Sequence, residues 1–500
     1  MKNQFPVSLF NTKIREKVLF KPINDDFVGM YVCGPTVYGD PHLGNARGAM
    51  TFDIVFRYLE YLGYNVRYVR NITDVGHLEN EVDELGEDKI AKQAKLNKLE
   101  PMEIVQRYTI SYHKAMESLN VLRPSIEPTA TGHIIEQIDI VQKIIDNGFA
   151  YESEGSVYFD MDAYLKKHKY GELSGKVIED MISGSRSLDG QNEKRTSADF
   201  ALWKAAKPEH IMKWPSPWGV GFPGWHVECT AMSSKYLGVP FDIHGGGMDL
   251  QFPHHEGEIA QSQCAFNSEP ANYWLHNNML TIDGQKMAKS KGNFLTLDEL
   301  FTGEHKLLDQ AYSPMTVRFF TLQSHYGSTI DFSNAALKAS EKGYKRLLNA
   351  LNTLNSLQFS LEGKLNAVLD QEINDLIDTC YIHMSDDFNT ARTIATLFDL
   401  AKKINEFKAK PSLLNKIKQS TFERLQKEFT GFFFDVLGFQ KETENESKHL
   451  DGAMNVLIEM RKQAKEDKDY GLSDKIRDQL KEYGISLQDE KGGEMSYLVE

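Results

Sequence analysis

Two segments in the middle of the chain carry side chains that could bind a metal ion. Cys229 falls in a segment with helical spacing, 225–237, and His254 and Glu258 lie four residues apart at the start of another. A thiolate, an imidazole and a carboxylate that a fold brings together are ligands suited to zinc. The spacing leaves His254 and His255 as alternatives, because His255 and Glu258 share a helix face as well. Polar residues at a helix start and a core cysteine would give the same pattern.

A further candidate ligand, Cys33, ends a short apolar run of strand length, 27–33. A turn rich in glycine and proline follows, with His42 just before a segment of helical spacing over 46–62 and a second strand over 65–70. This order predicts a βαβ unit, in which ligands bind at the carboxyl ends of strands and a helix N-terminus favours phosphate. The alternative is an ordinary turn in which Cys33 is a buried apolar residue. Spacing alone does not join Cys33 to the other candidate ligands.

Three lysines, Lys286, Lys289 and Lys291, lie on a segment flanked by Gly284 and Gly292. Lysines on a loop with glycine hinges can follow the charge that develops on phosphates during group transfer. A solvated basic loop without a catalytic role is the alternative interpretation.

The bulk properties limit the class of protein. A chain of 500 residues is too long for one compact core and indicates about two to four domains. Its four cysteines are too few and too scattered for a disulfide framework, so we expect a reducing cytoplasm. The N-terminus lacks the apolar block of a signal peptide, and no apolar run is long enough to span a bilayer. The net charge of −14 argues against a protein that coats nucleic acid through bulk positive charge.

The elements around these residues predict a nucleotide-binding sheet that is interrupted by an insertion. Residues 101–147 predict two helices, the irregular stretch 149–224 predicts the insertion, and spacing is helical from about residue 330 onward. The charged stretch 79–98 predicts a solvated helix pair with a loop, and the polar segment 441–448 predicts a linker. We expect these domains: the first half of the catalytic domain, 1–110; a connective insertion, 111–224; the second half with the lysine loop, 225–329; a helical bundle, 330–440; and a small C-terminal module, 441–500.

Together these segments resemble one family, the cysteinyl-tRNA synthetases, which are class I aminoacyl-tRNA synthetases. The resemblance runs through nearly the whole chain, and it rests on the order and spacing of several motifs. They are Cys33, His42–Asn45, Trp225–Cys229, HGGG at 244–247, PHHEGE at 253–258 and KMAKS at 286–290, with NITD at 71–74, SPWG at 216–219, RFF at 318–320, DDFNTA at 386–391 and KDYGLSDKIRD at 468–478. The resemblance implies an α/β fold: a Rossmann-like catalytic domain split by an insertion, then an all-α anticodon-binding bundle and a small C-terminal anticodon-binding module.

The resemblance also implies a metal and an amino-acid pocket. One zinc ion per subunit would be held by Cys33, Cys229, His254 and Glu258. This suits the substrate, because cysteine differs from serine by one chalcogen atom, which a hydrophobic pocket would separate poorly. Zinc binds a thiolate strongly and an alcohol weakly. The amino-acid pocket would be lined by Thr73, Trp225 and His244.

The nucleotide-binding residues are implied in the same way. His42 would donate to the ATP phosphates, and Gly44 would let the adenine lie close to the backbone. Lys286 and Lys289 would stabilise the departing pyrophosphate. The other ATP-binding positions would be Asn45, Gly245, Gly246, Gly247 and Asp249.

Three positions depart from the family pattern. Asn45 stands where the signature has its second histidine, so that phosphate contact must come from an amide. Ala288 stands where the signature loop has a serine, which removes a hydroxyl but no charge. Tyr497 lies near the place of a C-terminal tryptophan that is associated with anticodon recognition, so this contact would differ.

The implied reaction has two steps. ATP with Mg²⁺ activates L-cysteine to cysteinyl-adenylate, and tRNA(Cys) then accepts the cysteinyl group. Catalysis would come from positioning and charge stabilisation, without a protein nucleophile. Recognition of tRNA would use shape and splayed anticodon bases. The implied protein is a cytoplasmic monomer without a membrane partner.

Two other functions share parts of this pattern. A ligase that joins cysteine to an amino sugar makes the same adenylate but lacks an anticodon-binding tail, so the helical chain from 330 to 500 argues against it. A non-catalytic zinc- or RNA-binding paralogue has no need of a clamp for a leaving group. His42, Lys286 and Lys289 together argue against that alternative, whereas Asn45 and Ala288 keep it open.

Overall fold

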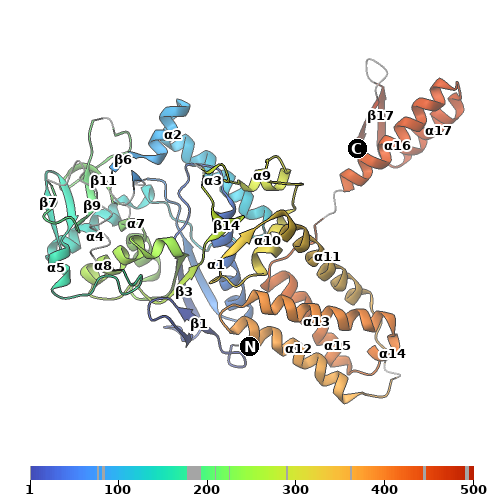
Figure 1. Ribbon diagram of the computed structural model, residues 1–500, viewed down its shortest axis with the longest axis horizontal. Coiled ribbons are helices and arrows are strands. Elements are labelled where there is room, and N and C mark those ends of the chain that lie inside the picture. The colour runs from blue at the N-terminus through green and yellow to red at the C-terminus, as the bar shows by residue number, and fades with distance from the viewer. Residues whose placement is uncertain are drawn as a thin grey trace. The chain divides into compact units, whose positions relative to one another are not determined.

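The computed structural model describes most of the chain, which forms two compact units (Figure 1). The larger unit is Met1–Gln440 and the smaller one is Lys441–Glu500. The described residues are 2–75, 78–80, 85–176, 193–208, 210–224, 226–288, 291–360, 363–442, 446–489 and 495–499. Within these ranges no helix is long and apolar enough to cross a membrane.

Four parallel strands form a sheet in the larger unit. They are β3 (Phe27–Val32), β4 (Asn65–Arg70), β12 (Phe241–Gly247) and β13 (Ala271–Asn277), in the order β13-β12-β3-β4. The chain moves outward from β3 to β4 on one side and from β12 to β13 on the other, so the strand order reverses between β3 and β12. Ligands bind at such a switch point, at the carboxyl ends of the strands. The sheet confirms the expected Rossmann-like fold.

Two helices, α1 (Leu43–Leu62) and α7 (Val227–Leu237), pack against this sheet. Met30 and Val32 of β3 belong to a core that includes the apolar residues of α1. Tyr31, which points to the opposite face, packs in a separate cluster with residues of α7. Such strands are apolar on both faces because both faces are covered. Cys33 follows β3 and packs against the α7 cluster.

Two element boundaries differ from the prediction. Helix α1 begins at Leu43, earlier than residue 46, because the side chain of His42 acts as its N-cap and accepts a hydrogen bond from the backbone N–H of Gly44. The sequence predicts a strand over 239–243 that ends before the HGGG motif, whereas strand β12 continues to Gly247 and so includes the three glycines. Those glycines have strand partners on β13, from Leu275 to Asn277.

The insertion contains a five-stranded antiparallel sheet. Its strands are β7 (Ala150–Ser153), β8 (Ser156–Phe159), β9 (Phe200–Ala205), β10 (Trp214–Ser216) and β11 (Gly219–Pro223), in the order β10-β11-β9-β8-β7. The two helices predicted before it are α3 (Pro101–Ser118) and α4 (Ile134–Asp146), with the short helices η1 (Thr131–His133) and α5 (Met161–Leu165).

One sequence prediction is wrong. Leu78–Asn80 (β5) and Leu85–Asp88 (β6) form an antiparallel pair where a helix is predicted, and helix α2 covers only Lys89–Asn97. A run of acidic residues is compatible with a helix and with a two-stranded ribbon. Charge density without an apolar period therefore could not distinguish them.

The remaining elements of the larger unit surround the sheet and form the helical bundle (Figure 1). The first group is β1 (Ser8–Asn11), β2 (Glu16–Leu19), η2 (Met248–Gln251), α8 (His254–Phe266), β14 (Leu280–Ile282), β15 (Gln285–Lys286), α9 (Leu297–Thr302), α10 (Pro314–Leu322) and β16 (Ile330–Phe332). The bundle is α11 (Asn334–Ser356), α12 (Ala367–Ser385), α13 (Thr390–Ala409), α14 (Pro411–Leu414), α15 (Gln419–Gly431) and η4 (Phe432–Val436). Its apolar faces continue the core of α1.

The smaller unit has two helices and a strand pair. Helices α16 (Glu446–Glu466) and α17 (Tyr470–Glu482) precede β17 (Ile485–Asp489) and β18 (Met495–Val499), which pair in antiparallel fashion. Tyr497 lies in β18 opposite Leu487.

Candidate active site

A cavity of about 660 Å³ opens at the carboxyl ends of β3 and β12. This volume is typical of sites for small molecules and cofactors, and the cavity lies at the switch point of the sheet. Eight of the residues singled out from the sequence line it: Cys33, His42, Gly44, Asn45, Gly246, Gly247, Asp249 and Lys286. Cys33 is a candidate metal ligand, whereas His42 and Lys286 are candidate nucleotide-binding residues. One cavity therefore connects the candidate metal site, which we call the metal end, with the candidate nucleotide site, which we call the nucleotide end.

The four predicted metal ligands come together beside the cavity, from β3, α7 and α8. The sulfur of Cys33 is 3.6 Å from that of Cys229 and 3.6 Å from Oε1 of Glu258. Nε2 of His254 is 3.4 Å from the sulfur of Cys229 and 3.2 Å from Oε1 of Glu258. Tetrahedral zinc with ordinary bond lengths separates such ligand atoms by about 3.3–3.8 Å. The donor set and its spacing therefore fit a zinc ion.

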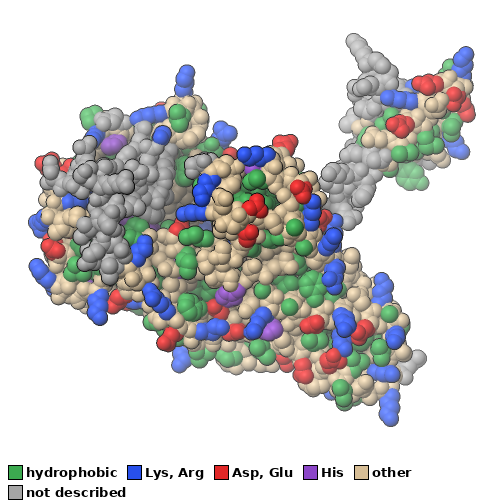
Figure 2. Space-filling model, in the orientation of Figure 1, with side chains coloured by type: hydrophobic (Ala, Val, Ile, Leu, Met, Phe, Trp, Pro, Cys, Tyr) green, Lys and Arg blue, Asp and Glu red, His purple; other side chains and the backbone are tan. Residues whose placement is uncertain are grey.

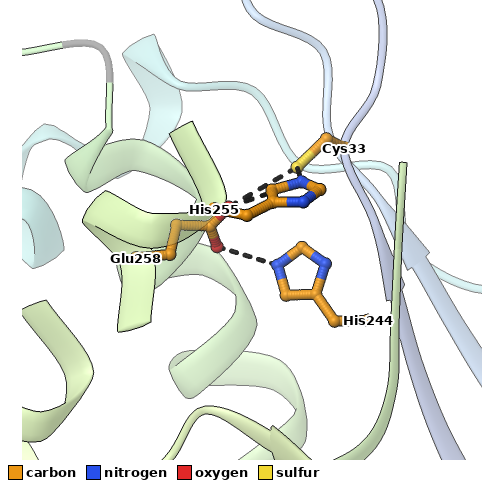
Figure 3. A group of neighbouring side chains, drawn as sticks. All are labelled: Cys33, His244, His255 and Glu258. Carbon is orange, nitrogen blue, oxygen red and sulfur yellow. Dashed lines mark hydrogen bonds and ion pairs between the residues drawn. The ribbon is translucent and has the colours of Figure 1, made fainter. Parts of the chain in front are cut away.

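A second group shares two of these residues and is drawn in Figure 3. In it, Nε2 of His255 is 3.3 Å from the sulfur of Cys33 and 3.9 Å from Oε1 of Glu258. Nε2 of His244 lies 2.9 Å from the other oxygen of Glu258, Oε2. This group has one thiol where the first has two, and its His244 occupies the carboxylate oxygen that points away from Cys33. The contact is the kind by which a hydrogen bond orients a ligating carboxylate.

The histidines around the cluster are arranged as hydrogen-bonding partners of the candidate ligands. Nδ1 of His254 lies 3.2 Å from Nδ1 of His226, and Nδ1 of His255 lies 2.8 Å from Nε2 of His276. Burial lowers the pKa of His255 well below its ordinary value and that of His276 to about 3, so both rings are neutral. Neutral rings can accept on one nitrogen and donate on the other, which is how a histidine shell fixes the orientation of metal ligands.

The two thiols are held in an environment that disfavours isolated charge. Burial raises the pKa of Cys229 to about 12, and burial together with the neighbouring Cys229 raises the pKa of Cys33 well above its ordinary value. A nearby cation reverses this preference, because it favours the thiolate. A cluster of two such thiols and a carboxylate is therefore better suited to a bound cation than to an apolar core.

The nucleotide end is organised by the N-terminus of α1. The imidazole Nδ1 of His42 accepts from the backbone N–H of Gly44 at 3.1 Å, so the N–H of the neutral ring belongs to Nε2. The side-chain oxygen of Asn45 accepts from the backbone N–H of His42 at 3.0 Å and completes a capping box. Asn45, which replaces a histidine of the signature, therefore holds the backbone of the histidine that remains.

The glycines at this end differ in what they contact. A Cβ on Gly44 would lie 2.9 Å from the ring of His42, and one on Gly246 would lie 2.8 Å from the ring of His255. Either substitution would displace a histidine. A Cβ on Gly245 would lie 2.2 Å from the ring of Phe52, so Gly245 allows β12 and α1 to approach rather than lining the cavity wall.

The lysine loop starts at β15, and Lys286 is exposed at the rim of the cavity. Asp283 and Gly284 form the tight turn before it, both with positive φ, as the sequence predicts. Lys289 and Trp225 lie outside the described residues, so their predicted roles remain predictions.

The predicted amino-acid residues Thr73 and His244 are buried, and His244 contacts the candidate ligand Glu258. Asn71, named above only as part of the NITD motif, connects Thr73 to the backbone after β3. The side-chain oxygen of Asn71 accepts from the N–H of Gly34 at 2.9 Å, and its amide donates to the hydroxyl of Thr73 at 3.1 Å. Thr73 in turn donates to Glu228 at 2.8 Å. The signal was present in the NITD motif, but only the fold shows that its first residue contacts the backbone after Cys33.

The sequence matches the class I (C) catalytic domain of tRNA synthetases over residues 19–342 and the DALR domain over residues 381–441. The cysteine–tRNA ligase of Cytophaga hutchinsonii is 60% identical over 97% of this chain and 97% of its own length. That of Deinococcus radiodurans is 45% identical over 97% of this chain and 96% of its own length. The chain belongs to the cysteine–tRNA ligase family. It is an enzyme, an aminoacyl-tRNA synthetase, as the motifs indicated.

Solved structures confirm the fold of this ligase. The methionyl-tRNA synthetase of Mycobacterium tuberculosis in complex with methionyl-adenylate aligns with a TM-score of 0.55 and 15% identity, over 82% of this chain and 89% of that one. A putative arginyl-tRNA synthetase from Campylobacter jejuni aligns with a TM-score of 0.53 and 13% identity, over 85% of this chain and 94% of that one. The fold of class I synthetases is common to them.

Proposed function

We propose that this cysteine–tRNA ligase selects L-cysteine with a zinc ion held by Cys33, Cys229, His254 and Glu258. The observation that carries the proposal is the spacing of their ligand atoms, 3.2–3.6 Å, at the wall of the cavity. The group with His255 and His244 is the less suitable holder, because His244 is engaged with the second oxygen of Glu258. His244 would then orient the carboxylate for the metal.

The metal end supplies discrimination that shape cannot. A bound zinc ion would offer a ligand position that a thiolate fills strongly and an alcohol weakly. The protein's part is to exclude water and to fix the ligands: Cys229, His254 and Glu258 are at most 2% exposed. We propose that Thr73, Trp225 and His244 complete the amino-acid pocket. Selection of sulfur at this point removes the need to reject serine later.

We propose that the nucleotide end holds ATP with Mg²⁺ for attack by the carboxylate of cysteine. The Nε2–H of His42 would donate to the phosphates, supported by the capping box with Asn45. Lys286 and Lys289 would stabilise the pyrophosphate as it leaves. Gly44, Gly246, Gly247 and Asp249 would shape the nucleotide site, and Gly245 would contribute only by letting β12 approach α1. The reaction needs no protein nucleophile, because the substrate carboxylate attacks the α-phosphate directly.

We propose tRNA(Cys) as the acceptor, with the bundle 330–440 and the module 441–500 reading the anticodon. The net charge of −14 agrees with recognition by shape and base contacts, because it leaves no large positive field. On the face drawn in Figure 2, basic and acidic side chains are interspersed over the helical bundle. The domain limits 1–110, 111–224 and 225–329, the monomeric state and the cytoplasmic location stay predictions of the sequence.

The proposal is tested by ATP–pyrophosphate exchange on the purified protein. Cysteine and serine are compared as substrates before and after removal of bound metal, and metal content is measured by elemental analysis. We expect one zinc per chain, exchange with cysteine only, and loss of exchange with the metal. Exchange with cysteine that survives complete metal removal would refute zinc selection but not adenylation. Absence of exchange in the metal-loaded protein would refute adenylation.

A further inference from the structure

The side chain of Asn293 bridges two described residues of the lysine loop, Lys286 and Ala288. Its side-chain oxygen accepts from the backbone N–H of Ala288 at 2.8 Å, and its amide nitrogen donates to the carbonyl of Lys286 at 3.3 Å. The backbone N–H of Lys291 also donates to the carbonyl of Ala288, at 3.1 Å. Gly292 has φ 65°, which lets the chain turn back toward its start. Both anchors of Asn293 are therefore backbone groups of the signature segment.

The residues after Asn293 contact the other signature. The ring of Phe294 packs edge-on against the ring of His42, with centroids 5.1 Å apart. His42 and Thr296 form an antiparallel bridge, and the N–H of Leu297 donates to the carbonyl of Pro41 at 2.9 Å. The segment 293–297, which we name the strap, thus binds the lysine loop at one end and the turn around His42 at the other.

We propose that Asn293 is a positioning residue for adenylation, which sets Lys286 relative to His42 through the strap. This inference rests on the proposed roles of Lys286 and His42 and adds a residue that touches neither substrate. Lys286 is anchored on one side by its strand pairing with Thr281. Asn293 supplies the anchor on the other side, and Phe294 links that anchor to the imidazole that caps α1. Group transfer is sensitive to misplacement of about 1 Å, so loss of this anchor would slow the reaction without removing a catalytic group.

The chemistry of the site explains why the residue is asparagine. The side chain must accept from the backbone N–H of Ala288 and donate to the backbone carbonyl of Lys286, which is two residues earlier. A short side chain with one acceptor and one donor, such as the amide of asparagine, can do both. Aspartate keeps the acceptor but loses the donor and adds a negative charge close to Lys286. Alanine loses both hydrogen bonds. The two substitutions therefore separate the anchor from the charge.

The chain offers a matched control in Asn334. Its side-chain oxygen accepts from the N–H of Asp309 at 2.9 Å, and its amide donates to the carbonyl of Leu307 at 2.7 Å. Asn334 is the first residue of α11 and makes the same pattern of two bonds to residues two apart, and its side-chain oxygen also accepts from the hydroxyl of Tyr312 at 2.8 Å. Asn334→Ala removes these three hydrogen bonds and measures what a loss at least as large as that in Asn293→Ala costs outside the strap.

The experiment compares Asn293→Ala, Asn293→Asp, Phe294→Leu and Asn334→Ala in the full chain. ATP–pyrophosphate exchange gives kcat and KM for cysteine, and limited trypsin digestion reports cleavage among the lysines of 286–291. We expect Asn293→Ala to lower kcat by about 10- to 100-fold with an unchanged KM for cysteine. Cleavage of the loop should become about fivefold faster or more, because its closed form is less populated. Asn293→Asp should be slower still, Phe294→Leu intermediate, and Asn334→Ala as wild type.

Several outcomes decide the matter. Unchanged kcat and loop cleavage in Asn293→Ala would overturn the proposal, as would an equal loss in Asn334→Ala. A third outcome is a lower kcat and a lower melting temperature in Asn293→Ala, with unchanged cleavage of the loop. This would assign Asn293 a general structural role and would also overturn the proposal. His42→Ala and Lys286→Ala are measured alongside. If both exchange at the wild-type rate, the proposed function of these residues has failed, which is a different result from failure of the strap.

Discussion

The two ends of the cavity place their polar groups in opposite surroundings. Near Cys33, the candidate ligands Cys229, His254 and Glu258 come from α7 and α8 and are at most 2% exposed. Near His42, the groups sit on a helix N-terminus and a loop, and Lys286 is exposed at the rim. Discrimination of sulfur from oxygen requires ligands that water cannot reach, because water would compete for the metal. Binding and release of a triphosphate require access and motion. In the proposed function, the buried metal end would select the substrate sulfur and the exposed nucleotide end would bind ATP and release pyrophosphate.

The largest expected effect breaks the metal end. Cys229→Ser should abolish stoichiometric zinc and lower kcat/KM for cysteine by about 10³-fold, because the hydroxyl is a poor ligand and stays protonated. Elemental analysis and ATP–pyrophosphate exchange measure the two losses. Cys264→Ser is the control: Cys264 is a buried thiol on α8 outside the cluster, and burial raises its pKa to about 12 as well. Full zinc and normal exchange in Cys229→Ser would contradict the assignment.

The second prediction concerns pH and the same end. Without metal, burial raises the pKa of Cys229 to about 12 and that of Cys33 well above its ordinary value, so both thiols are protonated between pH 7 and 9. Zinc takes thiolates, so its binding must release these protons and must strengthen as pH rises. The apparent Kd for zinc should fall about 100-fold per pH unit in this window, one factor of ten for each thiol. Competition with a chromophoric chelator measures it.

The control for this prediction is again the pair of cysteine variants. Cys264→Ser should keep the steep dependence, whereas Cys229→Ser, where it still binds zinc, should show about one factor of ten per pH unit. A Kd that does not change with pH in the wild type would mean that the thiols are already ionised without metal. The metal end would then not be the desolvated site described here.

The third prediction breaks the nucleotide end. Lys286→Ala should lower kcat of pyrophosphate exchange by about 10²-fold and leave the affinity for cysteine nearly unchanged, because the lysine acts on the leaving group. The same outcome is expected for Lys289→Ala, whose side chain lies outside the described residues. Lys291→Ala, on the same loop, is the control for a general loss of positive charge. An unchanged rate in both Lys286→Ala and Lys289→Ala would remove the loop from the reaction.

Much of this candidate site could be predicted from the sequence, because the spacing and the order of the motifs can be read without a structure. The ambiguity between His254 and His255 shows the limit of helical spacing. Both histidines face the cluster and each lies near a candidate ligand sulfur: His254 contacts Cys229, whereas His255 contacts Cys33 and, through its other nitrogen, His276. No period along one helix could reveal those partners, since they lie on α7, after β3 and on β13. The two hydrogen bonds of Asn293 to the lysine loop could not be predicted for a related reason, because they depend on how the loop folds back.

The motifs that resemble the family include residues that face the candidate site and residues that only hold the fold together. Arg318, in the RFF match, is fully buried, pairs with Asp53 of α1 and donates to the carbonyl of Leu437 at 2.7 Å. It joins the catalytic sheet's helix to the end of the bundle rather than facing the cavity. A motif match alone does not distinguish a residue that acts in the chemistry from one that packs, whereas its contacts do.

The smallest predicted effect sharpens the comparison at the N-terminus of α1. Asn45→Ala removes the side-chain oxygen that accepts from the N–H of His42 at 3.0 Å. Loss of such a cap costs about 1 kcal/mol, and we expect a decrease of that size in the free energy of unfolding by urea. The rate of exchange should fall only about three- to tenfold, since His42 keeps its ring and its bond to Gly44 and only its backbone is freed.

Asn45→Asp is the matched variant, because it keeps the acceptor oxygen. It should retain the stability, which a negative charge at a helix N-terminus favours, but lower the rate by repelling the phosphates. If Asn45 acts through the backbone of His42, Asn45→Ala therefore loses stability and some rate, whereas Asn45→Asp keeps its stability and loses rate. Equal loss of stability in both variants would mean that the amide nitrogen rather than the oxygen matters. The residue would then have to be assigned to the phosphates directly, as in the histidine that the signature places there.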